Sequence, residues 1–190
     1  VRDLNILVTS SLKSENSKYL DLLSSIGANA LRIKKEVEIE VVANDISKNA
    51  IERLKKNAKN NKIEIEILNE DAKNLKIDEK FDFIDIDPFG SPIKFLPYII
   101  KFLKKGTILS LTATDTSTLF GLKESTCLRR YGIKCSKTDF YRELGIRNLI
   151  TATIFLFSKF NILSIPIFGY SEKHFVKVYF KIDKGKTKVN

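Results

Sequence analysis

The segment Phe81–Pro92, which reads FDFIDIDPFGSP, constrains the fold of this chain more than any other. An apolar run with an acid at every second or third position makes a poor surface strand. It suits a buried parallel strand whose carboxyl end opens into a crevice. Pro88 cannot donate a ladder hydrogen bond and Gly90 frees the backbone, so we expect the strand to stop here. The strand end then presents the Asp87 carboxylate, the Pro88 carbonyl and the Phe89 ring together.

These three groups predict a site for a nucleobase. A carboxylate and a carbonyl are both hydrogen-bond acceptors, and an aromatic face stacks on a flat partner. The combination suits a planar heterocycle that carries an exocyclic amino group. We therefore predict that Asp87, Pro88 and Phe89 carry the chemistry.

The pattern along the rest of the chain predicts an α/β fold. Strand-like runs at 20–23, 37–43, 63–67 and 107–113 alternate with helix-like segments at 30–34, 47–60 and 93–103, the last expected to end at Lys104-Lys105-Gly106. Two more helices are predicted at 123–131 and 141–160. Strand-like runs at 162–168 and 175–182, joined through 169–174, close the chain. This order predicts a mostly parallel sheet with helices on both faces and an antiparallel strand pair at the C-terminal end.

Composition bounds the setting. At 190 residues and 43% apolar content, the chain is expected to form one globular domain, residues 1–190. It contains no run of about 18 uncharged apolar residues, so we expect neither membrane insertion nor export. The protein is expected to be cytoplasmic. Cys127 and Cys135 are expected to be reduced and structural, and no metal site is expected. The net charge of +10 favours a polyanionic partner, although a bias towards Lys, Ile and Asn explains it equally well.

Acidic residues at strand ends predict the cofactor. Asp45 and Asp71 follow the second and third strands, where one can accept ribose hydroxyls and the other can reach an adenine amine. The first turn carries a single glycine, Gly27, and lacks the G-x-G-x-x-G pattern that binds a pyrophosphate. S-adenosylmethionine has adenosine but no phosphate, and its positive charges favour carboxylates such as Asp21 and Asp87. Methyl transfer is the reaction that fits.

Six segments, in order along nearly the whole chain, resemble the tRNA (guanine-26-N2)-dimethyltransferase family of archaea and eukaryotes. They are Arg2-Asp3-Leu4-Asn5, Asn44-Asp45-Ile46-Ser47, Asp71-Ala72, Asp85-Ile86-Asp87-Pro88-Phe89-Gly90-Ser91-Pro92, Thr112-Ala113-Thr114-Asp115 and Cys127-Leu128-Arg129-Arg130-Tyr131. The resemblance implies a Rossmann-like class I methyltransferase sheet, S-adenosylmethionine as cofactor and tRNA as partner. It also implies that Asp87 is catalytic. The predicted cofactor-binding residues are Arg2, Asp21, Gly27, Asp45, Ile46, Asp71 and Ala72.

Two features depart from the family pattern. The family usually has a Thr-Gly-Ile-Arg turn after the first strand, so the cofactor contact of that arginine falls here on Asn29. Family members also carry a second, C-terminal domain that acts on tRNA, for which we expect no counterpart after Asn190. The chain is thus expected to be the catalytic domain alone, with a monomer favoured.

The predicted reaction transfers one or two methyl groups to the exocyclic N2 amine of a tRNA guanine, G26 by resemblance. Asp115, Arg129, Arg130 and Tyr131 are the predicted RNA-binding residues, Tyr131 as a stacking ring. A solvated helix end and, for Asp115, a helix cap are the alternatives. The runner-up functions are methylation of an adenine or cytosine amine and a tRNA-binding module without catalysis. His174 is expected to be a structural turn residue.

Overall fold

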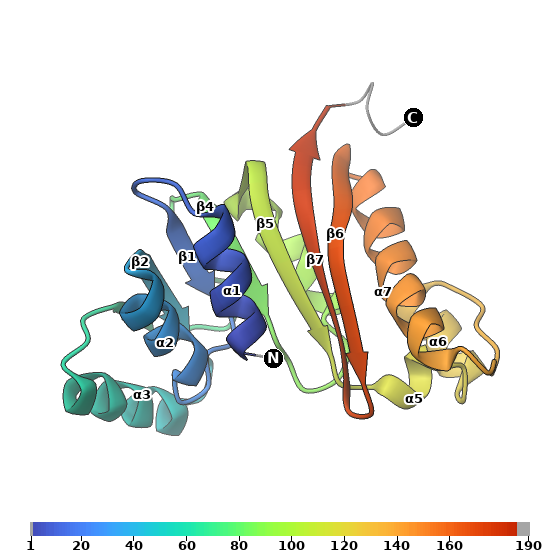
Figure 1. The fold of residues 1–190 in the computed structure, drawn as a ribbon, viewed down its shortest axis with the longest axis horizontal. Helices are drawn as coiled ribbons and strands as arrows, with labels where there is room; N and C mark the ends of the chain where they lie inside the picture. Colours follow the sequence, from blue (N-terminus) through green and yellow to red (C-terminus); the bar gives the residue numbers. More distant parts are fainter. Residues whose placement is uncertain (1, 186–190) are drawn as a thin grey trace. The chain divides into compact units, whose positions relative to one another are not determined.

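The computed structural model describes residues 2–185 (Figure 1). The chain divides into two compact units. Unit 1 comprises the chain up to Ile86 together with Tyr98–Leu103, and unit 2 comprises Asp87–Pro97 and the chain from Lys104 onward. The boundary therefore falls inside the segment singled out above, between Ile86 and Asp87.

The strands of unit 1 are parallel and lie in the order β3-β2-β1-β4. They span Lys18–Asp21 (β1), Glu40–Asn44 (β2), Glu66–Leu68 (β3) and Phe81–Ile86 (β4). Leu20 of β1 pairs with Val42 of β2 and Ile84 of β4, and all three side chains are buried. A strand covered on both faces accommodates the apolar run of β4, and β4 ends directly before Asp87, as predicted.

Three helices belong to unit 1: α1 (Arg2–Leu12), α2 (Ala28–Val37) and α3 (Lys48–Asn61). α1 packs against α2, and an ion pair between Arg32 and Asp3 (2.6 Å) joins them. α3 confirms the helix predicted from Ser47, whose hydroxyl accepts a hydrogen bond from the Ala50 amide at 3.3 Å as an N-cap. The face of α3 that is buried consists of Ile51, Leu54 and Ala58.

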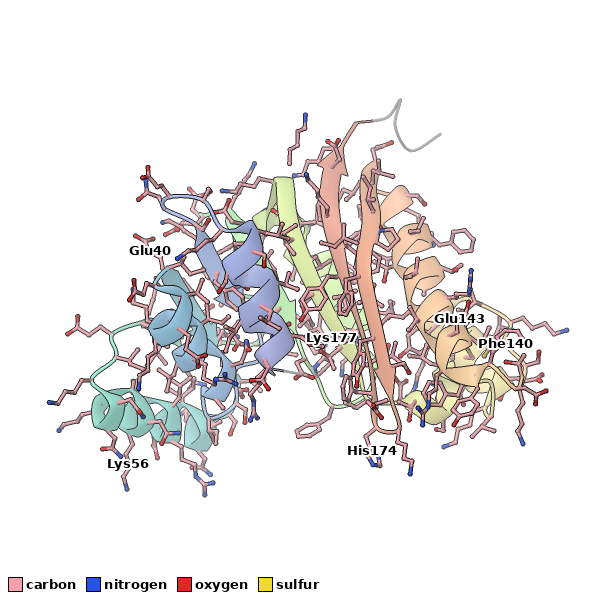
Figure 2. The ribbon with its side chains drawn as sticks, in the orientation of Figure 1. Glu40, Lys56, Phe140, Glu143, His174 and Lys177 are labelled. Carbon is pink, nitrogen blue, oxygen red and sulfur yellow. The ribbon has the colours of Figure 1, made fainter. Side chains whose placement is uncertain are left out.

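Unit 2 contains an antiparallel sheet in the order β5-β7-β6. These strands span Leu103–Ala113 (β5), Ile162–Glu172 (β6) and Phe175–Lys184 (β7). The predicted hairpin is confirmed, with His174 at its tip (Figure 2). Of the helices α5 (Thr116–Leu119), α6 (Glu124–Tyr131) and α7 (Tyr141–Ser158), α7 lies along β6 and β7 (Figure 1).

The helix predicted over 93–103 is interrupted. The segment forms a 3-10 turn η1 (Ile93–Phe95), a single α-helical turn α4 (Leu96–Ile99) and a second 3-10 turn η2 (Ile100–Phe102). Pro97 has no amide hydrogen to donate to the preceding turn, which explains why a continuous helix does not form. Lys104-Lys105-Gly106, predicted as the end of that helix, belong instead to β5.

Three further boundaries differ from the prediction. The first strand, predicted over 20–23, spans Lys18–Asp21. Val37, placed in a strand, is the last residue of α2, which continues to a C-cap at Glu38 (φ 61°). Ile63 and Ile65, predicted as strand, precede the short β3. The sequence patterns above predicted neither α1 nor α5. No helix within residues 2–185 is both long and apolar enough to span a membrane.

Candidate active-site residues

Gly27, in the turn after β1, has a conformation that requires glycine. Its φ of 82° is left-handed, and a Cβ atom here would lie 2.6 Å from Cγ of Leu54. The Gly27 amide donates to the Ser24 carbonyl (2.9 Å), and the Ser24 hydroxyl donates to the Asp21 carbonyl (2.8 Å). The turn is thereby held tight against the end of β1.

Asp45 follows β2 and joins two loops. Its carboxylate accepts hydrogen bonds from the backbone amides of Ser25 (2.8 Å) and Ser47 (2.9 Å). Each carboxylate oxygen has a second lone pair, so this half-buried side chain can still accept a ligand hydroxyl. The neighbouring Ile46 is 64% exposed.

Asn44 holds the loop that carries Asp71 and Ala72. Its fully buried side chain donates to the Glu70 carbonyl (3.0 Å) and accepts from the Glu70 amide (3.0 Å). Asp71 accepts a hydrogen bond from the Lys73 amide at 3.0 Å, and Ala72 is buried. Sequence reasoning did not select Asn44, although an asparagine directly before Asp45 at a strand end was a signal for this role.

Unit 1 therefore has six of the seven predicted cofactor residues, all but Arg2, at or beyond the ends of its strands. Asp21, Gly27, Asp45 and Asp71 lie at or beyond the carboxyl ends of β1, β2 and β3, the edge where parallel sheets bind ligands. Acceptors at the ends of β2 and β3, with the small Ala72 beside Asp71, fit the ribose and adenine of S-adenosylmethionine. Arg2 lies on a different element, at the exposed start of α1.

A polar network surrounds Asn29. The Asn29 amide donates to the Tyr19 hydroxyl (3.0 Å) and to Asp21 (3.1 Å). Asn5 donates to the Asn29 side-chain oxygen (2.9 Å) and to Asp85 (3.1 Å). Asp21 is only 3% exposed, so its carboxylate is occupied within this network in addition to its predicted place near the cofactor.

Unit 2 begins with the residues predicted to carry the chemistry. Asp87 is exposed, Pro88 is buried and the Phe89 side chain is 99% exposed. Gly90 (φ 90°) donates its amide to the Thr114 hydroxyl (2.7 Å), and the Thr114 amide donates to the Gly90 carbonyl (3.0 Å). This reciprocal pair holds the loop while Phe89 remains open to solvent.

Asp115 binds two of the other predicted RNA-binding residues. Its carboxylate accepts hydrogen bonds from the Tyr131 hydroxyl (2.5 Å) and the Arg130 guanidinium (3.0 Å). Its side chain does not cap α5. Tyr131 is 4% exposed, so a role as a stacking ring does not fit its position. Arg129 is exposed on the same helix.

Lys177 is a buried cation that sequence reasoning did not select. It lies on β7, and its ammonium donates to the Thr112 hydroxyl at 2.9 Å and lies 5.3 Å from the centre of the Tyr179 ring (Figure 2). A lysine between two valines of an apolar strand was the signal. Figure 2 also shows Glu143 on α7, where it pairs with Arg147 at 2.7 Å, as a spacing of four residues favours.

Two buried side chains of unit 2, the Cys127 thiol and the Tyr131 hydroxyl, have raised pKa values. Burial raises the pKa of the Cys127 thiol from 9.0 to about 12, and a hydrogen bond with Cys135 adds to the shift. Burial also raises the pKa of Tyr131 far above its usual value, and its bond to Asp115 adds to this, while Ser91 acts in the opposite sense. Both groups are neutral when protonated, so folding favours the protonated forms.

We expect the free energy of unfolding to fall above about pH 9, because the unfolded chain releases the Cys127 proton there while the folded chain keeps it to about pH 12. Cys127→Ala is expected to flatten this decline by up to about 1.4 kcal/mol per pH unit. Urea unfolding between pH 8 and 11 measures both slopes. Equal slopes for the two proteins would contradict the prediction, whatever the absolute loss caused by the substitution.

Comparison with known proteins decides the family. The model of a family described as N2,N2-dimethylguanosine tRNA methyltransferase matches residues 1–190. The chain belongs to this tRNA methyltransferase family. Curated members include tRNA (guanine(26)-N(2)/guanine(27)-N(2))-dimethyltransferase of Aquifex aeolicus, 41% identical over 91% of this chain and 46% of its own length. The tRNA (guanine(26)-N(2))-dimethyltransferase of Archaeoglobus fulgidus is 36% identical over 97% of this chain and 52% of its own length.

The chain thus spans about half the length of the curated relatives that it matches. Among solved structures, Trm1 from Pyrococcus horikoshii in complex with S-adenosyl-L-methionine is 30% identical, with a TM-score of 0.91 over 99% of this chain and 55% of that one. TYW2 from M. jannaschii, at 16% identity and a TM-score of 0.66, shares the fold. The predicted α/β methyltransferase fold and the predicted family are confirmed.

Proposed function

We propose that this chain is a methyltransferase domain that transfers one or two methyl groups from S-adenosylmethionine to the N2 amine of guanine 26 in tRNA. The observation that carries the proposal is the loop Asp87-Pro88-Phe89, in which an exposed aspartate and a 99% exposed aromatic ring follow directly after β4. Family membership supports the substrate, since the curated relatives are named for this reaction.

We assign the cofactor to unit 1. Asp45 and Asp71 would hold the ribose hydroxyls and the adenine amine, and Gly27 and Ile46 would flank them. S-adenosylmethionine supplies an electrophilic methyl group when bound. The predicted residues contain acceptors for its hydroxyl and amino groups, which supports this cofactor over a dinucleotide. The solved Trm1 structure is a complex with the same cofactor.

Asp87 and Pro88 act on the target base. The guanine amine is a poor nucleophile because its lone pair is delocalised into the ring. Hydrogen bonds from its two N–H groups to the Asp87 carboxylate and the Pro88 carbonyl favour the pyramidal form whose lone pair can react. When the guanine N2 nitrogen gains the methyl group, it releases a proton, and the Asp87 carboxylate accepts that proton. Positioning supplies much of the remaining catalysis.

Phe89 holds the base. A ring exposed to this degree loses contact with water when a base stacks on it, which stabilises a nucleotide drawn out of its helix. The distribution of charge supports tRNA binding by the same unit. Acidic and basic residues balance in unit 1, so the entire net charge of +10 belongs to unit 2. A polyanion is therefore expected to bind unit 2. We propose that the chain acts in the cytoplasm, as a monomer.

Incubation with S-adenosylmethionine and tRNA, followed by mass spectrometry of the nucleosides, tests the proposal. N2-methylguanosine or N2,N2-dimethylguanosine is expected from tRNA with G26 and not from the same tRNA with A26. Methylated adenosine or cytidine would assign the chain to another amino-methyltransferase class. Binding of tRNA with no heat of S-adenosylmethionine binding in calorimetry would indicate a binding module.

Phe89→Ala is expected to raise KM for tRNA about tenfold or more, because base stacking on an aromatic side chain contributes about 1–3 kcal/mol. The melting temperature should not fall, since a 99% exposed ring makes little contribution to the core. Steady-state kinetics and calorimetry measure both. Phe168→Ala is the control, because this exposed aromatic residue lies on β6. An unchanged KM in Phe89→Ala would remove the ring from base binding.

A further inference from the structure

The Asp115 carboxylate accepts hydrogen bonds from two side chains of α6. Tyr131, almost completely buried, donates its hydroxyl at 2.5 Å, and Arg130 donates its guanidinium at 3.0 Å to the other carboxylate oxygen. Only 9% of the Asp115 side chain is exposed. Hydrogen bonds to a charged acceptor are about twice as strong as neutral ones, and more so away from water. The carboxylate is therefore held from two directions by the last turn of α6.

This network continues into the loop that carries Asp87 and Phe89. Thr114, the residue before Asp115, exchanges two hydrogen bonds with Gly90, at 2.7 and 3.0 Å. The side chain of Ser91, the next loop residue, is a hydrogen-bond partner of the Tyr131 hydroxyl. The loop is thus connected to α6 both through the Thr114 backbone and through Ser91.

These contacts restrain the loop although its aromatic ring stands in solvent. Phe89 contributes almost nothing to packing, so the loop is held by the burial of Pro88 and by polar contacts beside the ring. If the Tyr131 hydroxyl is lost, Asp115 loses its hydrogen bond at 2.5 Å. Its adjacent Thr114 then loses part of the restraint that aligns it with Gly90.

We propose that Tyr131 and Asp115 are positioning residues that hold the loop Pro88–Ser91 in the arrangement that receives the base, rather than residues that contact RNA. The inference rests on the proposed function of Asp87 and Phe89. Arg130 belongs to the same network, because its guanidinium is engaged by Asp115, whereas Arg129 stays exposed.

Tyr131→Phe tests this, because it removes the hydroxyl and keeps the buried ring. kcat for tRNA methylation is expected to fall about tenfold, with KM for S-adenosylmethionine and Kd for tRNA changed less than twofold. Asp115→Asn, which keeps an acceptor for Tyr131, should lose less than Asp115→Ala. Thr153→Val is the control, since it removes another buried hydroxyl bond of unit 2, from Thr153 to the Leu149 carbonyl (2.7 Å), and should leave kcat unchanged.

Hydrogen exchange of segment 87–93 gives a readout that does not depend on catalysis. The Gly90 amide, bonded to Thr114, is expected to exchange about tenfold faster in Tyr131→Phe and at the wild-type rate in Thr153→Val. Unchanged exchange and unchanged kcat in Tyr131→Phe would overturn the inference while leaving the proposed function intact. If the wild-type protein methylates no tRNA, but Gly90 still exchanges faster in Tyr131→Phe than in wild type, the proposed function is refuted. The connection between the loop and α6 then still holds.

The salt dependence of tRNA binding separates positioning from phosphate contact. A residue that neutralises a phosphate releases counterions, so its removal lowers the slope of log K against log salt by about one. Arg130→Gln is expected to leave this slope unchanged and to lower kcat. A reduced slope with normal kcat would return Arg130 to the RNA-binding residues and overturn its place in the network.

Discussion

Asp87→Ala is expected to lower kcat for tRNA methylation at least a thousandfold. The substitution removes both the acceptor that orients the amine and the group that takes its proton. Acid–base groups alone contribute about 10²–10⁴-fold, and a thousandfold corresponds to about 4 kcal/mol of transition-state stabilisation. Affinity for S-adenosylmethionine should change little, because the predicted cofactor residues lie on unit 1.

Asp139→Ala is the matched control, since Asp139 is an exposed acid of unit 2 that lies on neither the Asp87 loop nor the Asp115 network. Single-turnover methylation and calorimetry with the cofactor measure the two effects separately. Near-normal turnover of Asp87→Ala would remove this carboxylate from the mechanism. A loss of cofactor binding would instead give Asp87 a binding role.

Gly121→Ala is expected to lower the free energy of unfolding by about 3 kcal/mol. Gly121 follows α5 with a φ of 82°, and an added Cβ would lie 2.3 Å from the backbone carbonyl of Ser136. A left-handed conformation costs a side-chain-bearing residue about 1–2 kcal/mol, and overpacking against backbone adds about 1–3 kcal/mol. The midpoint of urea unfolding at constant m measures the loss.

Gly132→Ala provides the comparison. Gly132 also has a left-handed backbone conformation, with a φ of 69°, but no atom lies within 4 Å of a Cβ added there. Its replacement is expected to cost about 1 kcal/mol from backbone conformation alone. Equal losses for the two variants would show that the backbone near Ser136 moves aside, and that the close approach at Gly121 does not restrict the fold.

Local sequence signals predicted much of both units. The buried character of Phe81–Ile86 and the stop at Pro88 follow from amino-acid type alone, and the helix from Ser47 follows from its cap and its apolar spacing. The interruption at Pro97 was also written in the sequence, since proline cannot donate within a helix. The extension of α2 to Val37 could not be predicted, because an apolar residue between a helix and a strand is buried in either element.

The role of Tyr131 could not be predicted in the same way. A tyrosine beside two arginines on a short helix is typical of a nucleic-acid surface, and its burial depends on Asp115, sixteen residues earlier in the chain. Asn5, Asn29 and Asp85 likewise meet only when α1, α2 and β4 pack. Patterns of neighbouring residues do not register such partners.

The sequence by itself determined that the strand Phe81–Ile86 ends directly before Asp87 and Phe89, and which family the chain resembles. These properties depend on local backbone chemistry: a missing amide hydrogen, a flexible glycine and the period of apolar residues. Only the tertiary structure decided which polar groups bind one another. Hydrogen bonds such as those of Asp115 and Asn29 form between residues that are distant in the chain and are brought together by burial of the core.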